Sequence, residues 1–77
     1  MNQSHVNQRT LPHNPQAEKS VLGAMLLNNK SIQIVAEILD EADFFKSSHQ
    51  IIYRESLVLF KKDGVLDQIS LVNHLSQ

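Results

Sequence analysis

Apolar residues spaced three and four positions apart constrain the fold of this chain more than any other feature of its sequence. Ile32, Val35 and Leu39 follow this spacing and fall on one face of a helix. Similar series lie in residues 15–27 and 48–62, and the second of these stretches is apolar on more than one face. No alternating run bounded by hairpin turns indicates a strand. The pattern therefore predicts an all-α fold.

Capping residues divide the first half of the chain into two predicted helices. Asn14 is a favoured N-cap and Pro15 suits the first helical position, so the first helix is predicted over residues 15–27. The Asn-Asn-Lys stretch that begins at Asn28 is predicted to end this helix, because Asn tolerates the left-handed conformation of a C-cap. Ser31 is the predicted cap of the second helix.

The second half of the chain contains two more predicted helices. Ser47 or Ser48 is predicted to cap the third helix, and Gly64 is predicted to end it. Asp67 or Ser70 is predicted to cap the fourth. The serines thus occupy positions typical of caps rather than of activated nucleophiles.

The predicted fold is a small orthogonal bundle of about four helices with an aromatic-anchored short turn. Phe44 and Phe45 are predicted to hold that turn against the core. Gly23 costs up to about 1 kcal/mol relative to Ala inside a helix, so close approach of a second helix is its predicted role. The residues predicted to form the core are Val21, Met25, Val35, Leu39, Phe44, Ile52, Leu59 and Leu75.

Size and composition exclude several classes of protein. With 77 residues the chain is predicted to be one small domain, and without cysteine it has neither disulfides nor thiolate metal sites. A formal net charge of −1 argues against a protein that coats nucleic acid. The longest apolar runs are far too short to span a bilayer, and the N-terminus lacks the features of a signal peptide. A cytoplasmic location is expected.

The sequence lacks the residue patterns of known catalytic and ligand-binding sites. Its two glycines, Gly23 and Gly64, do not form a phosphate-binding loop. The four histidines are scattered, with no pair four residues apart to hold zinc from one helix face. Carboxylates cluster only in residues 40–43, which are predicted to form an exposed turn. We therefore predict no catalytic, cofactor-binding or metal-binding residue.

A small helical DNA-binding regulator is an alternative at this point, because the chain has the size of a helix-turn-helix domain. Its recognition helix would be residues 68–77, in which Gln68 and Asn73 have side chains that contact adenine in such proteins. This stretch contains no Lys or Arg to bind phosphates, which counts against the alternative.

Blocks of residues in a particular order and spacing carry further information. These blocks are Leu11-Pro12-His13-Asn14, Ala17-Glu18, Ser20-Val21-Leu22-Gly23, Asp43-Phe44-Phe45, His49, Ile52, Tyr53, Leu59, Gly64, Asp67, Ser70-Leu71 and Leu75. In this order they resemble the N-terminal domain of DnaB-type replicative DNA helicases. Phe45 stands where Tyr is usual in that family, and Ser70 stands where Thr is common.

This resemblance implies a non-catalytic assembly and protein-interaction domain. Residues 11–77 would be the helicase N-terminal, or collar, domain, and residues 1–10 a flexible arm before it. The implied partners are other helicase subunits in a hexameric ring, primase and the helicase loader, with no membrane and no direct contact with DNA.

The enzymatic activity of the family lies outside the residues that carry the resemblance. ATP and Mg²⁺ are implied only for a separate ATPase domain, which unwinds DNA at the replication fork. The collar domain is expected to be cut before its last helices, which would cover the surplus apolar surface of residues 48–62. A stand-alone modulator of the helicase ring is the remaining alternative.

Overall fold

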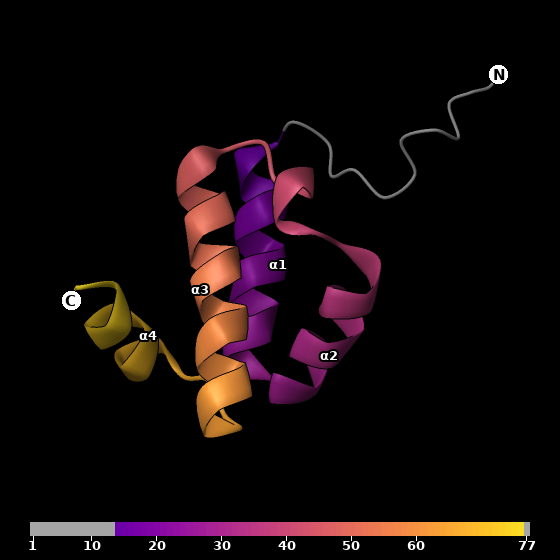
Figure 1. Cartoon of the computed structure of the whole chain (residues 1–77). Coiled ribbons are helices and arrows are strands. Elements are labelled where there is room, and N and C mark those ends of the chain that lie inside the picture. The colour runs from indigo at the N-terminus through magenta and orange to yellow at the C-terminus, as the bar shows by residue number, and fades with distance from the viewer. Residues whose placement is uncertain (1–13, 77) are drawn as a thin grey trace, which may run out of the picture.

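The computed structural model describes residues 14–76, which form helices and no strand (Figure 1). The elements are α1 (Pro15–Leu27), α2 (Asn29–Ile38), the 3₁₀ turn η1 (Glu41–Asp43), α3 (Ser47–Asp63) and α4 (Gln68–Leu75). The predicted all-α class is confirmed. The predicted arm, residues 1–10, and the first three residues of the Leu-Pro-His-Asn block lie outside the described residues.

Side-chain caps fix where α1 and α2 begin. Asn14 Oδ1 accepts hydrogen bonds from two backbone N–H groups of the first turn, at 2.9 and 3.3 Å, as predicted. Asn28 is both the C-cap of α1 and the N-cap of α2, where its side chain accepts from the Lys30 N–H at 3.0 Å. Its backbone is extended, with φ −145° and ψ 106°, so the predicted left-handed end of the first helix is wrong. The predicted cap Ser31 is also wrong, because α2 has already begun at Asn29.

The caps of α3 and α4 agree only in part with the predictions. Lys46 precedes α3 and makes no side-chain capping bond, so neither of the two predicted serines is its cap. The helix ends at Gly64, whose φ of 78° is the left-handed conformation that glycine adopts without strain. Asp67 caps α4 by accepting a hydrogen bond from the Ser70 N–H at 2.8 Å, as predicted.

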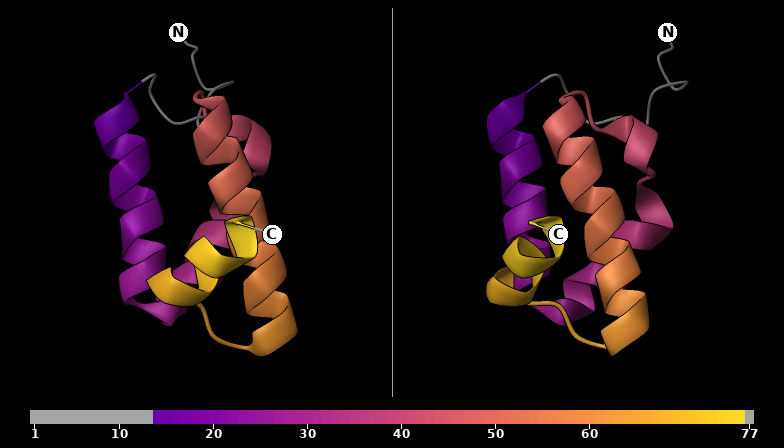
Figure 2. Two further views of the ribbon diagram at one scale, coloured as in Figure 1. Left: turned by 90° about the vertical axis from the view of Figure 1, so that its left-hand side faces the viewer. Right: turned by 60° about the vertical axis from the view of Figure 1, so that its left-hand side comes forward.

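The helices α1 and α3 lie side by side and run in the same direction (Figures 1 and 2). The helix α4 crosses one side of this pair, and α2 lies on the opposite side, where it packs against α1 (Figure 2). The short η1 turn returns the chain from the end of α2 to the start of α3. This arrangement places the core between α1 and α3, with α2 and α4 covering its two sides.

Buried apolar side chains from every α-helix form one core. They are Leu22, Met25, Ile32, Leu39, Phe44, Tyr53, Leu59, Leu66 and Leu71. The rings of Phe44 and Tyr53 pack with their centroids 4.8 Å apart and their planes tilted by 35°, a favoured geometry for aromatic pairs. The predictions of burial for Met25, Leu39, Phe44 and Leu59 are confirmed. Three further predicted core residues, Val21, Val35 and Ile52, are partly buried against this cluster.

Three predictions about packing are wrong. Leu75 is 40% exposed, because it is the last residue of α4, one turn beyond the buried Leu71. The Phe45 side chain is 64% exposed, so the aromatic ring that the turn buries in the core is that of Phe44. Within the described residues, nothing lies within 4 Å of a side-chain carbon added at Gly23, so no neighbouring helix requires a glycine there.

Candidate interaction surface

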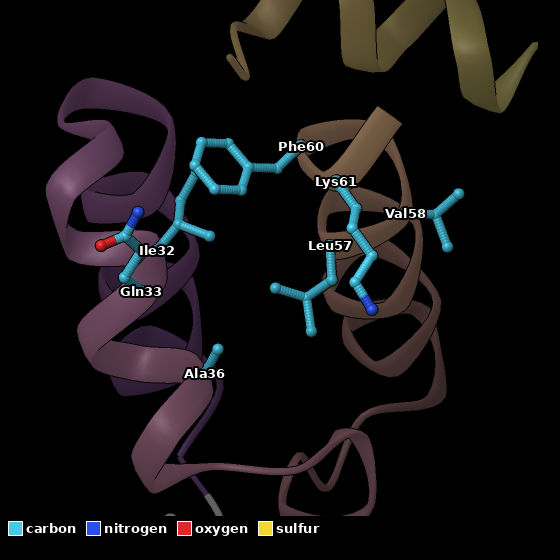
Figure 3. A pocket seen from close by; sticks show the side chains of 7 residues that line it. All are labelled: Ile32, Gln33, Ala36, Leu57, Val58, Phe60 and Lys61. Atoms are coloured by element: carbon cyan, nitrogen blue, oxygen red, sulfur yellow. The ribbon is translucent and has the colours of Figure 1, made fainter. Parts of the chain in front are cut away.

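An open apolar groove separates α2 from α3 (Figure 3). It forms because α2 packs on α1 rather than on α3. Its volume is about 490 Å³, which lies within the range of about 300–1,000 Å³ typical of ligand sites. The side chains that line it are Ile32, Gln33, Ala36, Leu57, Val58, Phe60 and Lys61.

Two polar clamps hold the ends of α2 to the α3 side of the bundle. At the first residue of α2, the Asn29 amide donates to the Leu66 carbonyl at 2.9 Å and accepts from the Leu66 N–H at 3.0 Å. After the last turn of α2, the Tyr53 hydroxyl donates to the Leu39 carbonyl at 2.6 Å. Burial raises the pKa of Tyr53, and nearby acidic side chains raise it further, so this hydroxyl stays protonated at neutral pH. Hydrogen bonds therefore hold both ends of α2, the helix that forms one wall of the groove.

The groove has apolar walls and a polar rim. Of the residues that line it, Lys61 alone carries a charge at neutral pH, and Gln33 is the one other polar residue. No carboxylate among the lining residues is available to act as a nucleophile or a general base. This lining suits the burial of apolar side chains.

A buried carboxylate lies behind the start of α3. Glu18, on α1, is 1% exposed and accepts three hydrogen bonds from the segment that leads into α3. The donors are the Phe45 N–H at 2.7 Å and the Lys46 N–H at 3.4 Å, and His49 Nδ1 lies 2.7 Å from the same carboxylate. In the sequence, Glu18 stood out only as part of the block Ala17-Glu18, and the structure places it in the first turn of α1, where acids are common. The pairing was not predicted, because its partners lie 27 to 31 positions away.

These hydrogen bonds decide the charge of Glu18. Burial raises the pKa of the carboxyl, but the hydrogen bonds from Phe45, His49 and Lys46 outweigh that effect, so its pKa lies below the ordinary value. The carboxylate is therefore ionised at neutral pH. Because it faces its own donors and is shielded from solvent, it fixes α1 to the start of α3 and is not positioned to act on a substrate.

An ion-pair network on the surface joins α3 to α4. Glu55 lies 2.7 Å from His74 Nε2 and 3.1 Å from Arg54 Nε, and Arg54 Nη1 reaches Glu41 at 3.1 Å. Hydrogen bonds from His74 and Arg54 lower the pKa of Glu55. Because these groups are substantially exposed, water and salt weaken the network.

The two described histidines thus pair with different carboxylates and not with each other. His5 and His13 lie outside the described residues. Within residues 14–76, no group of three or more His, Cys, Asp or Glu side chains is arranged to hold a metal ion. None of the helices there is long and apolar enough to cross a membrane.

Large apolar side chains occur at many places on the surface. Those of the described residues that are at least 40% exposed are Leu27, Ile34, Ile38, Phe45, Ile51, Val58, Val65, Ile69, Val72 and Leu75. Three of them, Ile69, Val72 and Leu75, recur every three residues along α4. Single exposed apolar residues are ordinary, but such a series along one helix is typical of contact surfaces.

The fold and this surface define a small all-α domain with an open apolar groove. Buried hydrogen bonds of Glu18 and Tyr53 connect its helices around the core. The chain belongs to the DnaB-like helicase N terminal domain family, whose model matches residues 10–77. This confirms the family suggested by the sequence blocks.

Curated relatives are replicative DNA helicases. The chain is 40% identical over 67 residues to the replicative DNA helicase DnaB of Buchnera aphidicola subsp. Baizongia pistaciae, covering 87% of this chain and 14% of that protein. It is 35% identical over 71 residues to the replicative DNA helicase DnaC of Bacillus subtilis, covering 92% and 16%. It is 40% identical over 73 residues to DnaB of Rickettsia bellii, covering 95% and 15%.

The chain thus spans 14–16% of the length of these relatives. No solved structure matches it.

Proposed function

We propose that this chain is a non-catalytic assembly and protein-interaction domain of a replicative DNA helicase. In this proposal, a separate ATPase domain binds ATP and Mg²⁺ and unwinds DNA at the replication fork. The collar domain, residues 11–77, contacts other helicase subunits in a ring, and it contributes to the binding of primase and the helicase loader. It makes no direct contact with DNA and acts in the cytoplasm.

The apolar surface carries this proposal. A domain of this size buries a small core, so apolar side chains left in water are costly unless a partner covers them. The groove between α2 and α3 and the outer face of α4 present such side chains on opposite sides of the bundle. Contacts with two neighbours at once are what a subunit of a ring requires. The family match supports a helicase as the setting.

The proposal is tested by measuring association of the chain with itself and with a helicase. Sedimentation velocity over a wide range of chain concentrations is expected to show reversible self-association. Immobilised chain is expected to capture a purified full-length replicative helicase from a relative, in the presence or absence of ATP. Strictly monomeric behaviour together with no capture would contradict the assembly role. ATP hydrolysis by the chain alone would contradict the non-catalytic role.

A further inference from the structure

We propose that two copies of this chain pair through the outer face of α1, as a two-fold dimer in which the α1 helices run antiparallel and cross at Gly23 and Ala24. The inference rests on the assembly function proposed above and adds the surface and the geometry of one contact. In Figure 2, α1 lies at one edge of the bundle.

A second hollow, smaller than the α2–α3 groove, lies between α1 and α2. Its volume is about 310 Å³, and no charged residue and no residue of α3 or α4 lines it. The lining residues are Ser20, Val21, Ala24, Ser31, Ile34 and Val35. The Ser20 hydroxyl donates to the Gln16 carbonyl at 3.0 Å, so an apolar side chain can cover it without leaving this donor unpaired.

A large apolar side chain of the same helix matches this hollow. Leu27, at the end of α1, is 90% exposed, the highest fraction among the large apolar side chains of residues 14–76. It lies seven positions after Ser20, so both residues fall on one face of the helix. In an antiparallel pair, Leu27 of one copy lies opposite Ser20 of the other, at the hollow of that copy. Two-fold symmetry repeats the same contact in the other direction.

Gly23 lies at the centre of this face, and its cost inside a helix has no explanation within the part of the chain that the structure describes. A side-chain carbon added there meets nothing within 4 Å. Together, Gly23 and Ala24 let another helix approach closely, because the distance between packed helices depends on the side chains at their contact. A two-fold axis between these two residues puts both at the crossing point.

The charges around this face favour a second copy. The face consists of Gln16, Ser20, Gly23, Ala24 and Leu27, none of which is charged, so two identical faces meet without repulsion. Lys19 flanks the face, but its two copies are about 13 Å apart along the helix axes. That exceeds the Debye length of about 8 Å at physiological ionic strength. A contact of one helix and one hollow is smaller than the standard interface of about 800 Å² per partner, so the dimer is expected to be weak and reversible.

Cysteine cross-linking tests this geometry, because the chain contains no cysteine. A disulfide requires two α-carbons within about 7 Å. The Ala24→Cys variant has its own copy directly across the two-fold axis, so mild oxidation of the full chain is expected to give a disulfide-linked dimer. The Gln16→Cys variant is about 22 Å from its own copy along the helix axes, so it is expected to stay monomeric.

The Ser20→Cys and Leu27→Cys variants provide a matched comparison. Alone, each has its own copy about 10 Å away along the helix axes, which is beyond disulfide reach. Mixed, they are expected to form a linked heterodimer, because position 27 of one copy lies opposite position 20 of the other. A parallel pair would instead link every variant to its own copy, the Gln16→Cys variant included.

Sedimentation velocity of the full chain measures the strength of the pairing. Ala24→Arg is expected to weaken self-association by about tenfold, by steric exclusion. Ala36→Arg is the matched control, because Ala36 is exposed and lies outside the hollow. Leu27→Ser is expected to weaken self-association by about tenfold, since a buried leucine is lost from each of two symmetric contacts. Its control is Ile69→Ser, which alters an exposed apolar residue of α4.

Gly23→Ala separates association from the stability of the single chain. The added carbon has room within one copy, so the higher helix propensity of Ala is expected to raise Tm by roughly 4–8 °C at low chain concentration. In the dimer the same carbon lies at the crossing point, so self-association is expected to weaken several-fold. A residue with only a structural role in the single chain would not change these two measurements in opposite directions.

Three results would overturn the inference. One is that Ala24→Cys cross-links no faster than Gln16→Cys, and another is that Ala24→Arg leaves self-association unchanged. Either result would assign self-association to another surface, and the proposed function would stand. The third is a chain that stays monomeric at every concentration. In that case the proposed function stands if the chain still captures a full-length helicase, and it is lost with the inference if the chain does not.

Discussion

Replacing Glu18 provides a direct test of how this small bundle is stabilised. Glu18→Ala removes the acceptor for the Phe45 N–H and leaves His49 without its carboxylate partner. A buried donor left without its acceptor costs about 1–3 kcal/mol, and the Phe45, Lys46 and His49 donors all lose the same carboxylate. Because small domains lie near the lower end of the usual range of about 5–15 kcal/mol, the variant is expected to be largely unfolded at room temperature.

Glu18→Gln separates the loss of charge from the loss of the acceptor. The amide retains one oxygen of similar position, so a loss of about 1–3 kcal/mol is expected, the range for weakening charged hydrogen bonds. For a domain of this size, each 1 kcal/mol lowers Tm by roughly 4–8 °C. The control is Glu37→Gln on α2, an exposed carboxylate for which a change within about 0.5 kcal/mol is expected.

Urea and thermal unfolding followed by circular dichroism measure these differences. The free energy of unfolding is expected to rank the original chain above Glu18→Gln and Glu18→Gln above Glu18→Ala. If Glu18→Ala unfolded within about 0.5 kcal/mol of the control, the reasoning would be refuted, because an unpaired buried donor cannot cost so little. An amide spectrum in which the Phe45 resonance did not move would contradict the assigned hydrogen bond.

Further measurements test other parts of the structure. The pKa of Glu18 is lower in the folded chain than its ordinary value of 4.5, so its contribution to stability is present above that pH and is lost as the pH falls through the folded pKa. Thermal melts are expected to show this loss in acid, and Glu18→Gln to reduce the dependence. Leu59→Ala is expected to cost about 2–5 kcal/mol, and Leu75→Ala much less, by urea unfolding, since only the first side chain is buried. Asn29→Ala is expected to cost about 1–3 kcal/mol and to speed hydrogen exchange at the Leu66 amide, which loses its acceptor. Unchanged exchange at that amide would show that the clamp is absent in solution.

Local chemistry explains which structural features could be predicted from the sequence. Asn14, Gly64 and Asp67 were assigned correctly because capping depends on a few neighbouring residues. Asn28 was assigned the wrong conformation because a second helix begins immediately after it. The sequence shows that an Asn favours a helix end, but it does not show which end the side chain will serve.

The features that could not be predicted depend on contacts between distant residues. The sequence marked Tyr53 only as part of a family block, and its burial depends on partners elsewhere, because its ring packs on Phe44 and its hydroxyl bonds to a carbonyl 14 positions away. Asn29 and Leu66 are 37 positions apart, and no local pattern marks them. The groove itself depends on the angle between two helices, so surplus apolar surface on residues 48–62 was predicted but its shape was not.

The two clamps at the ends of α2 have a kinetic consequence. A helix held at one end only can change its angle, and this changes the width of a neighbouring groove. By contrast, α2 is held by hydrogen bonds at Asn29 and, after its last turn, at Leu39. Its ten residues span about 15 Å between these ties. The walls therefore keep their separation before any ligand arrives, and little conformational entropy remains to be lost on binding. Ligands of this surface should differ mainly in residence time, through how well their side chains fill a space of fixed width.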